Sequence, residues 1–316
     1  MSSAAVVIGR NEGERLERCL ASLLGFSPVV YVDSGSTDGS VALAQSKGAD
    51  IVVLDEATVF TAARARNAGL ARLEDIAPDG TFVQMIDGDC ELSETWGTVA
   101  EAALLADDQL AVVCGRRREK HPEASVWNRL IDAEWDTQIG DAKACGGDAL
   151  MRRSALSAVQ GYRGDLIAGE EPELCFRLRR AGWKILRIQA EMTAHDAAMT
   201  RFSQWWQRSR RAGFAYANGA ALHGTSPERF RVAETRRAVL WGAALPLVGV
   251  LGGLVFPWLG LLLLAFPAQV LRLQRRGLDW VAATAMTVGK FPEAQGVVGF
   301  YWGYLTGRRR GLIEYK

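Results

Sequence analysis

Cysteine and histidine are both scarce in this sequence. Its 316 residues include 5 cysteines and 3 histidines. The number of cysteines is odd, and no two of them have the C-x-x-C spacing that is common in structural zinc sites. The sequence therefore predicts neither a disulfide framework nor a structural zinc site, and it fits a reducing compartment.

The sequence also lacks low-complexity segments, internal repeats and a recognisable export signal. Residues 1–8 are too short for the apolar part of such a signal, and charged residues follow from Arg10 onward. Hydrophobic residues make up 49% of the chain and charged residues 23%, so a folded chain with a substantial core is expected.

The net charge of +1 hides an uneven distribution. Residues 223–316 contain 12 Lys and Arg against 5 Asp and Glu, whereas the preceding 222 residues contain 25 against 31. A nucleic-acid-binding protein usually carries positive charge on its folded body. The acidic body therefore argues against nucleic acid as a partner, and the basic tail indicates a surface that faces anionic lipid.

Short apolar runs alternate with helical patterns in the first part of the chain. Strands are expected at residues 4–8, 29–32, 51–54 and 82–86, and helices at 12–24, 41–47 and 62–73. Continuously apolar strands separated by helices predict a mostly parallel sheet that is covered on both faces. Ligands of such sheets bind at the carboxyl ends of the strands, which directs attention to residues 9–12, 33–35 and 87–89.

The pattern is less regular from about residue 116. Helices are expected at 126–138, 171–181 and 202–221, and strands near 145–151 and at 184–188.

Residues 238–271 contain no charged side chain, and arginines flank them on both sides. One membrane span needs about 20 residues, so this run is too long for one helix and slightly short for two. Pro257 lies near its middle, and the sequence predicts a hairpin of two short helices with both ends on the cytoplasmic side. Residues 278–305, rich in Trp and Tyr, are expected to lie in the membrane interface. The alternative is a buried helical hairpin in a soluble protein.

Two acidic clusters are candidates for chemistry. Asp87 and Asp89 flank a glycine directly after an apolar run, where they could hold a divalent cation, although such spacing also occurs in surface turns. Glu170, Glu171 and Glu173 lie together at the start of a predicted helix. Neighbouring like charges tune a general base or a metal pair, and the alternative is an acidic helix N-terminus.

Two further polar residues, Asp33 and His195, each allow a functional and a structural interpretation. His195 follows a strand-like segment and is either a metal ligand or a structural histidine. Asp33 lies at a strand end, where it could accept a hydrogen bond from a nucleoside or could cap the next helix.

Five motifs occur in order within residues 4–222. They read VVIGRNE from residue 6, VDSGSTDGS from 32, ARARNAG from 63, MIDGDC from 85 and GEEPELCFRLRRAGW from 169. As a set they resemble the motifs of family 2 glycosyltransferases. The tail, including residues 290–293 and 308–316, is similar to that of membrane-associated bacterial polysaccharide glycosyltransferases.

This resemblance implies a GT-A fold, which is an α/β, Rossmann-like fold with a mostly parallel sheet flanked by helices. It also implies inverting transfer of a sugar from a nucleotide-diphosphate donor, with a UDP-sugar as the donor that the family favours. The residues implied in nucleotide binding are Gly9, Asn11, Glu12, Asp33, Arg66, Asn67 and Asp87. Those implied in binding Mg²⁺ or Mn²⁺ are Asp87, Asp89 and His195.

The resemblance places Glu171 where the family has its general base, an Asp, and Glu170 or Glu173 could fill that role instead. Gly9 and Arg10 depart from the family pattern, so the contact with the nucleotide base could differ. Residues 204–211 are similar to a Q-x-x-R-W segment of processive synthases but lack its Arg-Trp order. The candidates for contact with the acceptor or the diphosphate are Gly147, Asp148, Arg208 and Arg211.

The expected protein has three parts. Residues 1–115 form the nucleotide-sugar-binding half of the GT-A domain, 116–222 its acceptor-binding half, and 223–316 a C-terminal membrane-associated helical region with a hairpin at about 238–271. The catalytic domain is expected to face the cytoplasm at the cytoplasmic membrane and to use a lipid-linked or polysaccharide acceptor. A nucleotidyltransferase and a non-catalytic membrane scaffold are the alternatives.

Overall fold

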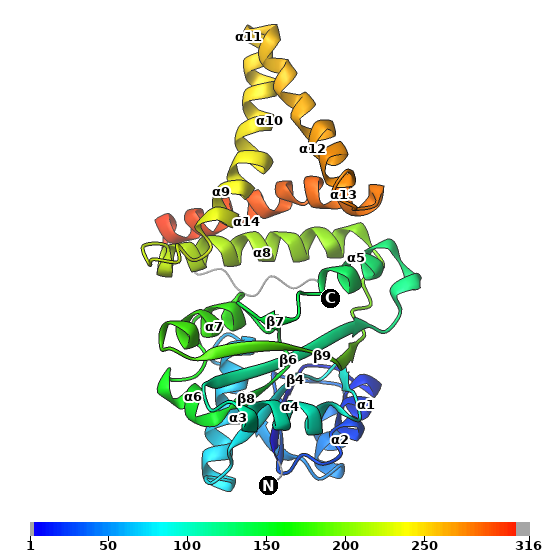
Figure 1. Ribbon diagram of the computed structural model, residues 1–316, viewed down its shortest axis with the longest axis vertical. Coiled ribbons are helices and arrows are strands. Elements are labelled where there is room, and N and C mark those ends of the chain that lie inside the picture. The colour runs from blue at the N-terminus through cyan, green and yellow to red at the C-terminus, as the bar shows by residue number, and fades with distance from the viewer. Residues whose placement is uncertain (1–2, 308–316) are drawn as a thin grey trace. The chain divides into compact units, whose positions relative to one another are not determined.

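A computed structural model of the chain describes residues 3–307 (Figure 1). It consists of two compact units, Met1–Ala198 and Met199–Lys316. The basic segment 308–316, predicted as part of the membrane-associated region, lies outside the described residues, as do residues 1 and 2.

The boundary between the units differs from the sequence prediction, which divided the chain after residue 222. Helix α8 (Phe202–His223) groups with the C-terminal helices because its glycine face packs directly on another helix of the second unit. The division predicted at residue 115 lies within a strand of one continuous sheet. The separate binding roles of its two halves stay a prediction.

Nine strands form one sheet in the described part of the first unit. They are β1 (Ala4–Gly9), β2 (Val29–Asp33), β3 (Asp50–Val53), β4 (Phe82–Asp87), β5 (Cys90–Leu92), β6 (Leu110–Glu119), β7 (Gly140–Asp141), β8 (Ala149–Arg152) and β9 (Lys184–His195). Their order is β3-β2-β1-β4-β8-β6-β9-β5, and β7 pairs with β9.

The sheet is parallel in its first half and mixed in its second. Strands β3, β2, β1 and β4 are parallel, as their apolar sequences predict. Strand β8 then enters between β4 and β6 and is antiparallel to both, while β9 is parallel to β6. The prediction of a mostly parallel sheet therefore describes the N-terminal half, and the α/β fold with flanking helices is confirmed.

Seven α-helices accompany the sheet in the described part of this unit. They are α1 (Glu14–Ser22), α2 (Ser40–Ser46), α3 (Ala62–Ile76), α4 (Trp96–Ala106), α5 (Val126–Glu134), α6 (Arg153–Ala158) and α7 (Glu170–Arg180). Helix α3 packs closely on β1, since a Cβ atom at Gly69 would lie 2.3 Å from the Val6 side chain. This contact determines how far Arg66 and Asn67, which lie on the same helix, are from the sheet.

The second unit is helical. After α8 come α9 (Val232–Val239), α10 (Leu245–Leu247), α11 (Gly253–Val255), α12 (Ala265–Gln274), α13 (Trp280–Val288) and α14 (Lys290–Thr306). The π-helical segments Leu240–Ala244 and Val248–Gly252 and the 3₁₀ segment Pro257–Leu264 join them. Helices α10 and α12 form the two arms of a hairpin that turns beyond α11 (Figure 1).

The hairpin turns where the sequence predicts it. Phe256 is extended, as the residue before a proline prefers, and Pro257 starts the second arm. The arms approach through glycine, because a Cβ atom at Gly249 would lie 2.7 Å from Leu263, and one at Gly253 would lie 3.3 Å from Gly260. Small residues allow this kind of close helix contact in membranes.

The first arm continues the preceding helix without a break. In residues 3–307, one helix is long and apolar enough to cross a membrane by length and composition, and it is the 24-residue Val232–Val255. Only 11% of its most apolar window is buried. The core of a soluble protein would bury such a helix, so the exposed surface weakens the soluble alternative.

Candidate active site

The loops after β1 and β2 lie against each other at the carboxyl edge of the sheet. The register of the sheet pairs Gly9 with Asp33. The Asn11 side-chain oxygen accepts a hydrogen bond from the Thr37 backbone N–H at 2.7 Å, and the Asn11 N–H donates to Ser36 Oγ at 2.9 Å. The structure thus brings the predicted nucleotide-binding segments 9–12 and 33–38 together.

Asp33 shapes one of these loops. Its Oδ2 atom accepts hydrogen bonds from the N–H groups of Gly35 and Ser36 at 2.9 and 2.8 Å, and its Oδ1 atom accepts one from the Tyr31 hydroxyl at 3.0 Å. The residue is only 1% exposed. Glu12, from the neighbouring loop, forms an ion pair with Arg15 at 2.9 Å. The contacts predicted between these carboxylates and a nucleotide stay predictions.

A single buried arginine connects the two acidic clusters. Arg66 on α3 donates from Nη2 to Asp87 Oδ1 at 2.8 Å and from Nη1 to Glu170 Oε1 at 2.9 Å. Burial alone would lower the pKa of this guanidinium, but Asp87 and then Tyr162 and Glu170 raise it above its usual value. Arg66 therefore carries a permanent charge that holds the Asp87 segment beside the start of α7.

Asn67, the neighbour of Arg66, binds the backbone of the loop that precedes α7. Its Nδ2 donates to the Tyr162 carbonyl at 2.6 Å, and its Oδ1 accepts from the Tyr162 N–H at 2.8 Å. Asn67 therefore supports this loop, and its predicted position beside the nucleotide stays a prediction.

Asp89 and His195 form the part of the site that suits a metal ion. Strands β5 and β9 pair Cys90 with His195, which brings His195 Nε2 to 3.3 Å from Asp89 Oδ2. Potential ligand atoms of Asp89, Cys90 and His195 lie within 4.8 Å of one another, in a group that does not include Asp87. All three residues are buried.

The protonation of His195 also suits metal binding. Burial, and then the charge of Arg117, lower the pKa of His195 to about 4. The imidazole is therefore neutral near pH 7, which is the form that binds metals. Its buried Nδ1 atom has no hydrogen-bond partner among the described residues. A carboxylate with a neutral imidazole fits a divalent cation, and Asp89 and His195 would hold it.

Asp148 supports other residues of the site, and its predicted contact with the acceptor or the diphosphate stays a prediction. It is fully buried. Its Oδ1 accepts from the Asp87 N–H at 3.1 Å, and its Oδ2 accepts from Thr193 Oγ1 at 2.9 Å and pairs with Arg117 Nη2 at 2.6 Å. Asp148 therefore orients Asp87 and Arg117. Arg117 was missed from the sequence, where only the run of arginines at 116–118 could have drawn attention to it.

Gly147 lies next to Asp87 and Arg66, and its predicted contact with the acceptor or the diphosphate stays a prediction. A Cβ atom there would lie 2.8 Å from Asp87 Oδ2, 3.1 Å from Arg66 Nη2 and 3.2 Å from Arg117 Nη2. Only glycine lets the backbone approach these charged groups so closely. The loop containing Gly147 therefore covers the Asp87–Arg66 pair.

The three carboxylates at the start of α7 have three different environments. Glu170 pairs with Arg66, and Glu173, which is 1% exposed, pairs with Arg177 at 2.9 Å. Glu171 Oε1 accepts hydrogen bonds from the Cys145 N–H at 2.5 Å and from Cys175 Sγ at 3.0 Å. Among the described residues, no cation pairs with Glu171.

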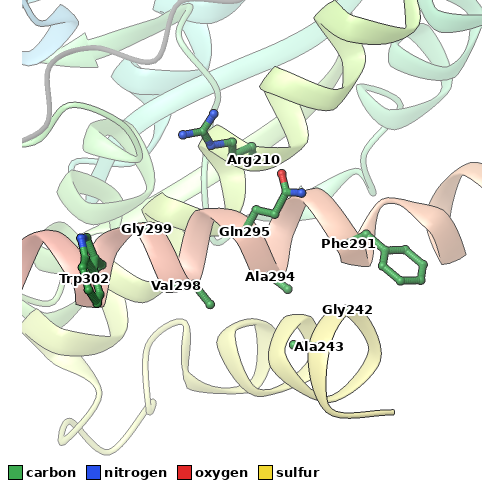
Figure 2. Close-up of a pocket in the computed structure, with 9 residues that line it drawn as sticks. All are labelled: Arg210, Gly242, Ala243, Phe291, Ala294, Gln295, Val298, Gly299 and Trp302. Atoms are coloured by element: carbon green, nitrogen blue, oxygen red, sulfur yellow. The ribbon is translucent and has the colours of Figure 1, made fainter. Parts of the chain in front are cut away.

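The second unit carries the remaining predicted residues and a cavity of its own. Arg208 and Arg211 lie on α8, and their predicted contact with the diphosphate stays a prediction. A largely apolar cavity of about 440 Å³ lies between the base of the hairpin and α14. Figure 2 shows Gly242 and Ala243 on one side and Trp302 on the other.

A Rossmann-like sheet with these acidic groups at its carboxyl edge defines the GT-A class of glycosyltransferase. Residues 4–159 match the model of the family described as Glycosyl transferase family 2. Residues 4–159 therefore form a family 2 glycosyltransferase domain, and the protein is a glycosyltransferase, as predicted from the sequence. The family match argues against the nucleotidyltransferase alternative. A scaffold with a degenerate transferase domain would match the same family, so the measurement of donor turnover separates that alternative from an enzyme.

Two relatives and one solved structure are similar over most of the chain. The succinoglycan biosynthesis protein ExoA of Rhizobium meliloti (strain 1021) is 25% identical over 236 residues, which cover 70% of this chain and 69% of ExoA. The pre-mycofactocin glycosyltransferase of Mycobacterium tuberculosis (strain CDC 1551 / Oshkosh) is 28% identical over 69% of this chain and 47% of that protein.

The solved structure is the mannosyltransferase PcManGT from Pyrobaculum calidifontis in complex with GDP-Man and Mn²⁺. It has a TM-score of 0.61 and 18% identity, and the match covers 95% of this chain and 87% of that one. At this identity the likeness establishes the fold, and the GT-A prediction is confirmed.

Proposed function

We propose that the protein transfers a sugar, with inversion, from a nucleotide-diphosphate donor to a lipid-linked or polysaccharide acceptor. The observation that carries this proposal is the double ion pair of Arg66 with Asp87 and Glu170. It supports placing the metal-binding and proton-accepting clusters in one site, although 83 residues separate them along the chain. A single in-line displacement needs both in one place.

Glu171 is the proposed general base. Glu170 is engaged by Arg66 and Glu173 by Arg177, so each of these carboxylates positions a cation. In the part of the chain that the structure describes, Glu171 has only a backbone N–H and a thiol as hydrogen-bond partners. It can therefore accept the proton of an acceptor hydroxyl without breaking an ion pair.

Asp89 and His195 are the proposed ligands of Mn²⁺ or Mg²⁺. A divalent cation supplies charge that stabilises the diphosphate leaving group. The positive charge of Arg117, held by Asp148, lies near His195 and adds to the potential at the same place. Asp87 then remains for the nucleotide, oriented by Arg66 and by its hydrogen bond to Asp148.

The donor nucleotide that we propose is UDP, on the resemblance of the motifs alone, while PcManGT was solved with GDP-Man. The proposed acceptor class follows from the name of ExoA, a succinoglycan biosynthesis protein, and from the apolar hairpin. The cavity in Figure 2 would accommodate the apolar part of a lipid-linked acceptor. The catalytic domain would then work on the cytoplasmic face of the membrane.

A donor screen tests this function. The detergent-solubilised chain is incubated with UDP-, GDP- and TDP-sugars, with and without Mn²⁺, and release of nucleotide diphosphate is measured. One donor should be turned over only when Mn²⁺ is present. Asp89→Asn should lose this Mn²⁺-stimulated turnover. Glu171→Gln should lower the rate of transfer about 100-fold or more, which is the usual contribution of a positioned general base.

The matched control is Glu94→Gln, which makes the same chemical change at an exposed site of the first unit. It should retain wild-type rates. Folding of every variant is checked by circular dichroism. Unchanged transfer in both Asp89→Asn and Glu171→Gln would disprove the assignment of the site.

A further inference from the structure

Two cysteines and the proposed base converge in a buried cluster. Cys145 precedes β8, and Cys175 lies on α7 one turn after Glu171. Their Sγ atoms are 3.6 Å apart, and Cys175 Sγ lies 3.0 Å from Glu171 Oε1. Cys145 is 8% exposed, Glu171 6% and Cys175 0%. The proposed glycosyl transfer uses neither thiol.

The spacing of these atoms matches the edges of a metal tetrahedron. Two thiolates bound to Zn²⁺ at about 2.3 Å in tetrahedral geometry lie about 3.8 Å apart, and the two Sγ atoms here are 3.6 Å apart. One ligand atom from each of the three residues can be chosen so that all lie within 4.8 Å of one another. A thiolate pair with one carboxylate would leave a fourth position for water.

The donor atoms distinguish this cluster from the Asp89–His195 group. Two thiols and a carboxylate select soft or borderline cations such as Zn²⁺ and Cd²⁺, whereas oxygen-rich sites suit Mg²⁺ and Mn²⁺. The group at Asp89 has only one thiol, that of Cys90. A thiophilic ion is therefore expected to prefer Cys145 and Cys175.

We propose that Cys145, Glu171 and Cys175 form a binding site for a thiophilic divalent cation, and that filling it inhibits glycosyl transfer. Binding of Zn²⁺ forms two Zn–S bonds and one Zn–O bond and releases the two thiol protons to solvent. The carboxylate of Glu171 is then a metal ligand and cannot accept a proton from the acceptor. The inhibition rests on the proposed role of Glu171, whereas the binding does not.

Cd²⁺ tests the binding directly, because thiolate-to-Cd²⁺ charge transfer produces an ultraviolet absorption band. The full chain is kept reduced in detergent with saturating Mn²⁺ and titrated with Cd²⁺. We expect one equivalent to produce a band with the intensity of two thiolates. Cys145→Ser and Cys175→Ser should each lose about half of that intensity and bind at least about tenfold more weakly.

Two other buried cysteines provide matched controls. Cys19→Ser should keep the full band, and Cys90→Ser should also keep it, since that thiol belongs to the other group. Glu171→Gln retains both thiols and should keep the intensity of the band with weaker binding. A band of wild-type intensity and affinity in both Cys145→Ser and Cys175→Ser would overturn the site.

Inhibition is measured separately with Zn²⁺ and the donor found in the screen. Wild-type transfer should be inhibited at Zn²⁺ concentrations at least about tenfold lower than transfer by Cys175→Ser. If the two-thiolate Cd²⁺ band forms but Zn²⁺ does not inhibit transfer, the proposed inhibition is overturned and the proposed metal site is retained. If no donor is turned over, the proposed function fails. The Cd²⁺ absorption band still tests the metal site, because binding does not depend on glycosyl transfer.

Discussion

At the scale of single residues, the addition of one methyl group at Gly147 should have a large effect on the rate of transfer. An added methyl group would lie 2.8 Å from Asp87 Oδ2, and Arg66 and Asp148 hold Asp87 in place. Gly147→Ala should therefore displace the carboxylate and lower transfer roughly 10- to 100-fold, because small misplacements are costly in catalysis. The rate is measured at saturating donor, and unfolding by circular dichroism should change little.

Gly164→Ala is the control for this substitution. No atom lies within 4 Å of the added methyl group, and the backbone of Gly164 is not left-handed. Its activity should equal that of the wild type. Equal activity in Gly147→Ala would show that the loop does not constrain Asp87.

The sequence predicts the location of a site residue when the motif that contains the residue lies at the end of a strand or on a strand. Asp89 and His195 meet as expected because a strand end and a paired strand bring them together. Asn67 and Asp148 lie close to the site and bind a backbone segment and the Asp87 N–H, contacts that the sequence does not predict. No local pattern distinguishes a carboxylate that binds a ligand from one that orients its neighbour, because both are polar residues beside a strand.

At the scale of elements, the crossing of α8 and α14 depends on glycine. A Cβ atom at Gly213 would lie 2.0 Å from the Glu293 carbonyl oxygen, and one at Gly296 would lie 2.0 Å from that of Arg210. A backbone atom cannot rotate away as a side chain can, so the helices would have to separate. Gly213→Ala should therefore destabilise the second unit by about 1–3 kcal/mol, the usual cost of overpacking.

Thermal unfolding in detergent checks this prediction, with Gly260→Ala as its control. Within residues 3–307, apart from its chain neighbours and the backbone of its own helix, no atom lies within 4 Å of an added Cβ at Gly260. That variant should unfold at or slightly above the wild-type temperature, since alanine favours helix. Equal unfolding temperatures for Gly213→Ala and Gly260→Ala would contradict the close crossing.

The sequence predicts the first four strands and the helices α7 and α8 closely, but it misses β6 and α4, although both contain apolar runs. The first four strands follow apolar runs, and β1 differs by a single residue from the predicted 4–8. Strand β9 extends to His195 instead of ending near residue 188, and β6 continues through the arginine run 116–118 to Glu119. Ion pairs of Arg116 and Arg118 with Asp132 stabilise this polar part of β6, and such long-range pairs have no local signature.

The same limit applies to the cysteine cluster. Spacing along the chain excluded a structural zinc motif, and Cys145 and Cys175 are 30 residues apart. Folding brings them together because the loop that contains Cys145 lies against α7, where the Cys145 N–H donates to Glu171. Sequence spacing identifies only metal sites whose ligands are close along the chain.

At the scale of the whole molecule, charge and exposed apolar surface are concentrated in the same part of the chain. Leu247, Leu251 and Leu254 of the first arm are 57%, 59% and 80% exposed. The arm begins with Arg236 and Arg237, and residues 223–316 have an excess of seven positive charges by sequence. An apolar helix that follows basic residues is the arrangement expected of a membrane segment with its basic end in the cytoplasm.

Leu247→Asp tests whether this surface enters a bilayer. A carboxylate in the centre of a spanning helix costs about 3 kcal/mol, which corresponds to about a hundredfold in partitioning. The variant should therefore no longer float with vesicles that contain anionic lipid, while donor hydrolysis in detergent stays unchanged. Leu105→Asp makes the same change at a 69% exposed position on α4 of the first unit and should float like the wild type. Equal flotation of the two variants would contradict insertion of the helix, because a protein held to lipid only by its basic residues does not distinguish between them.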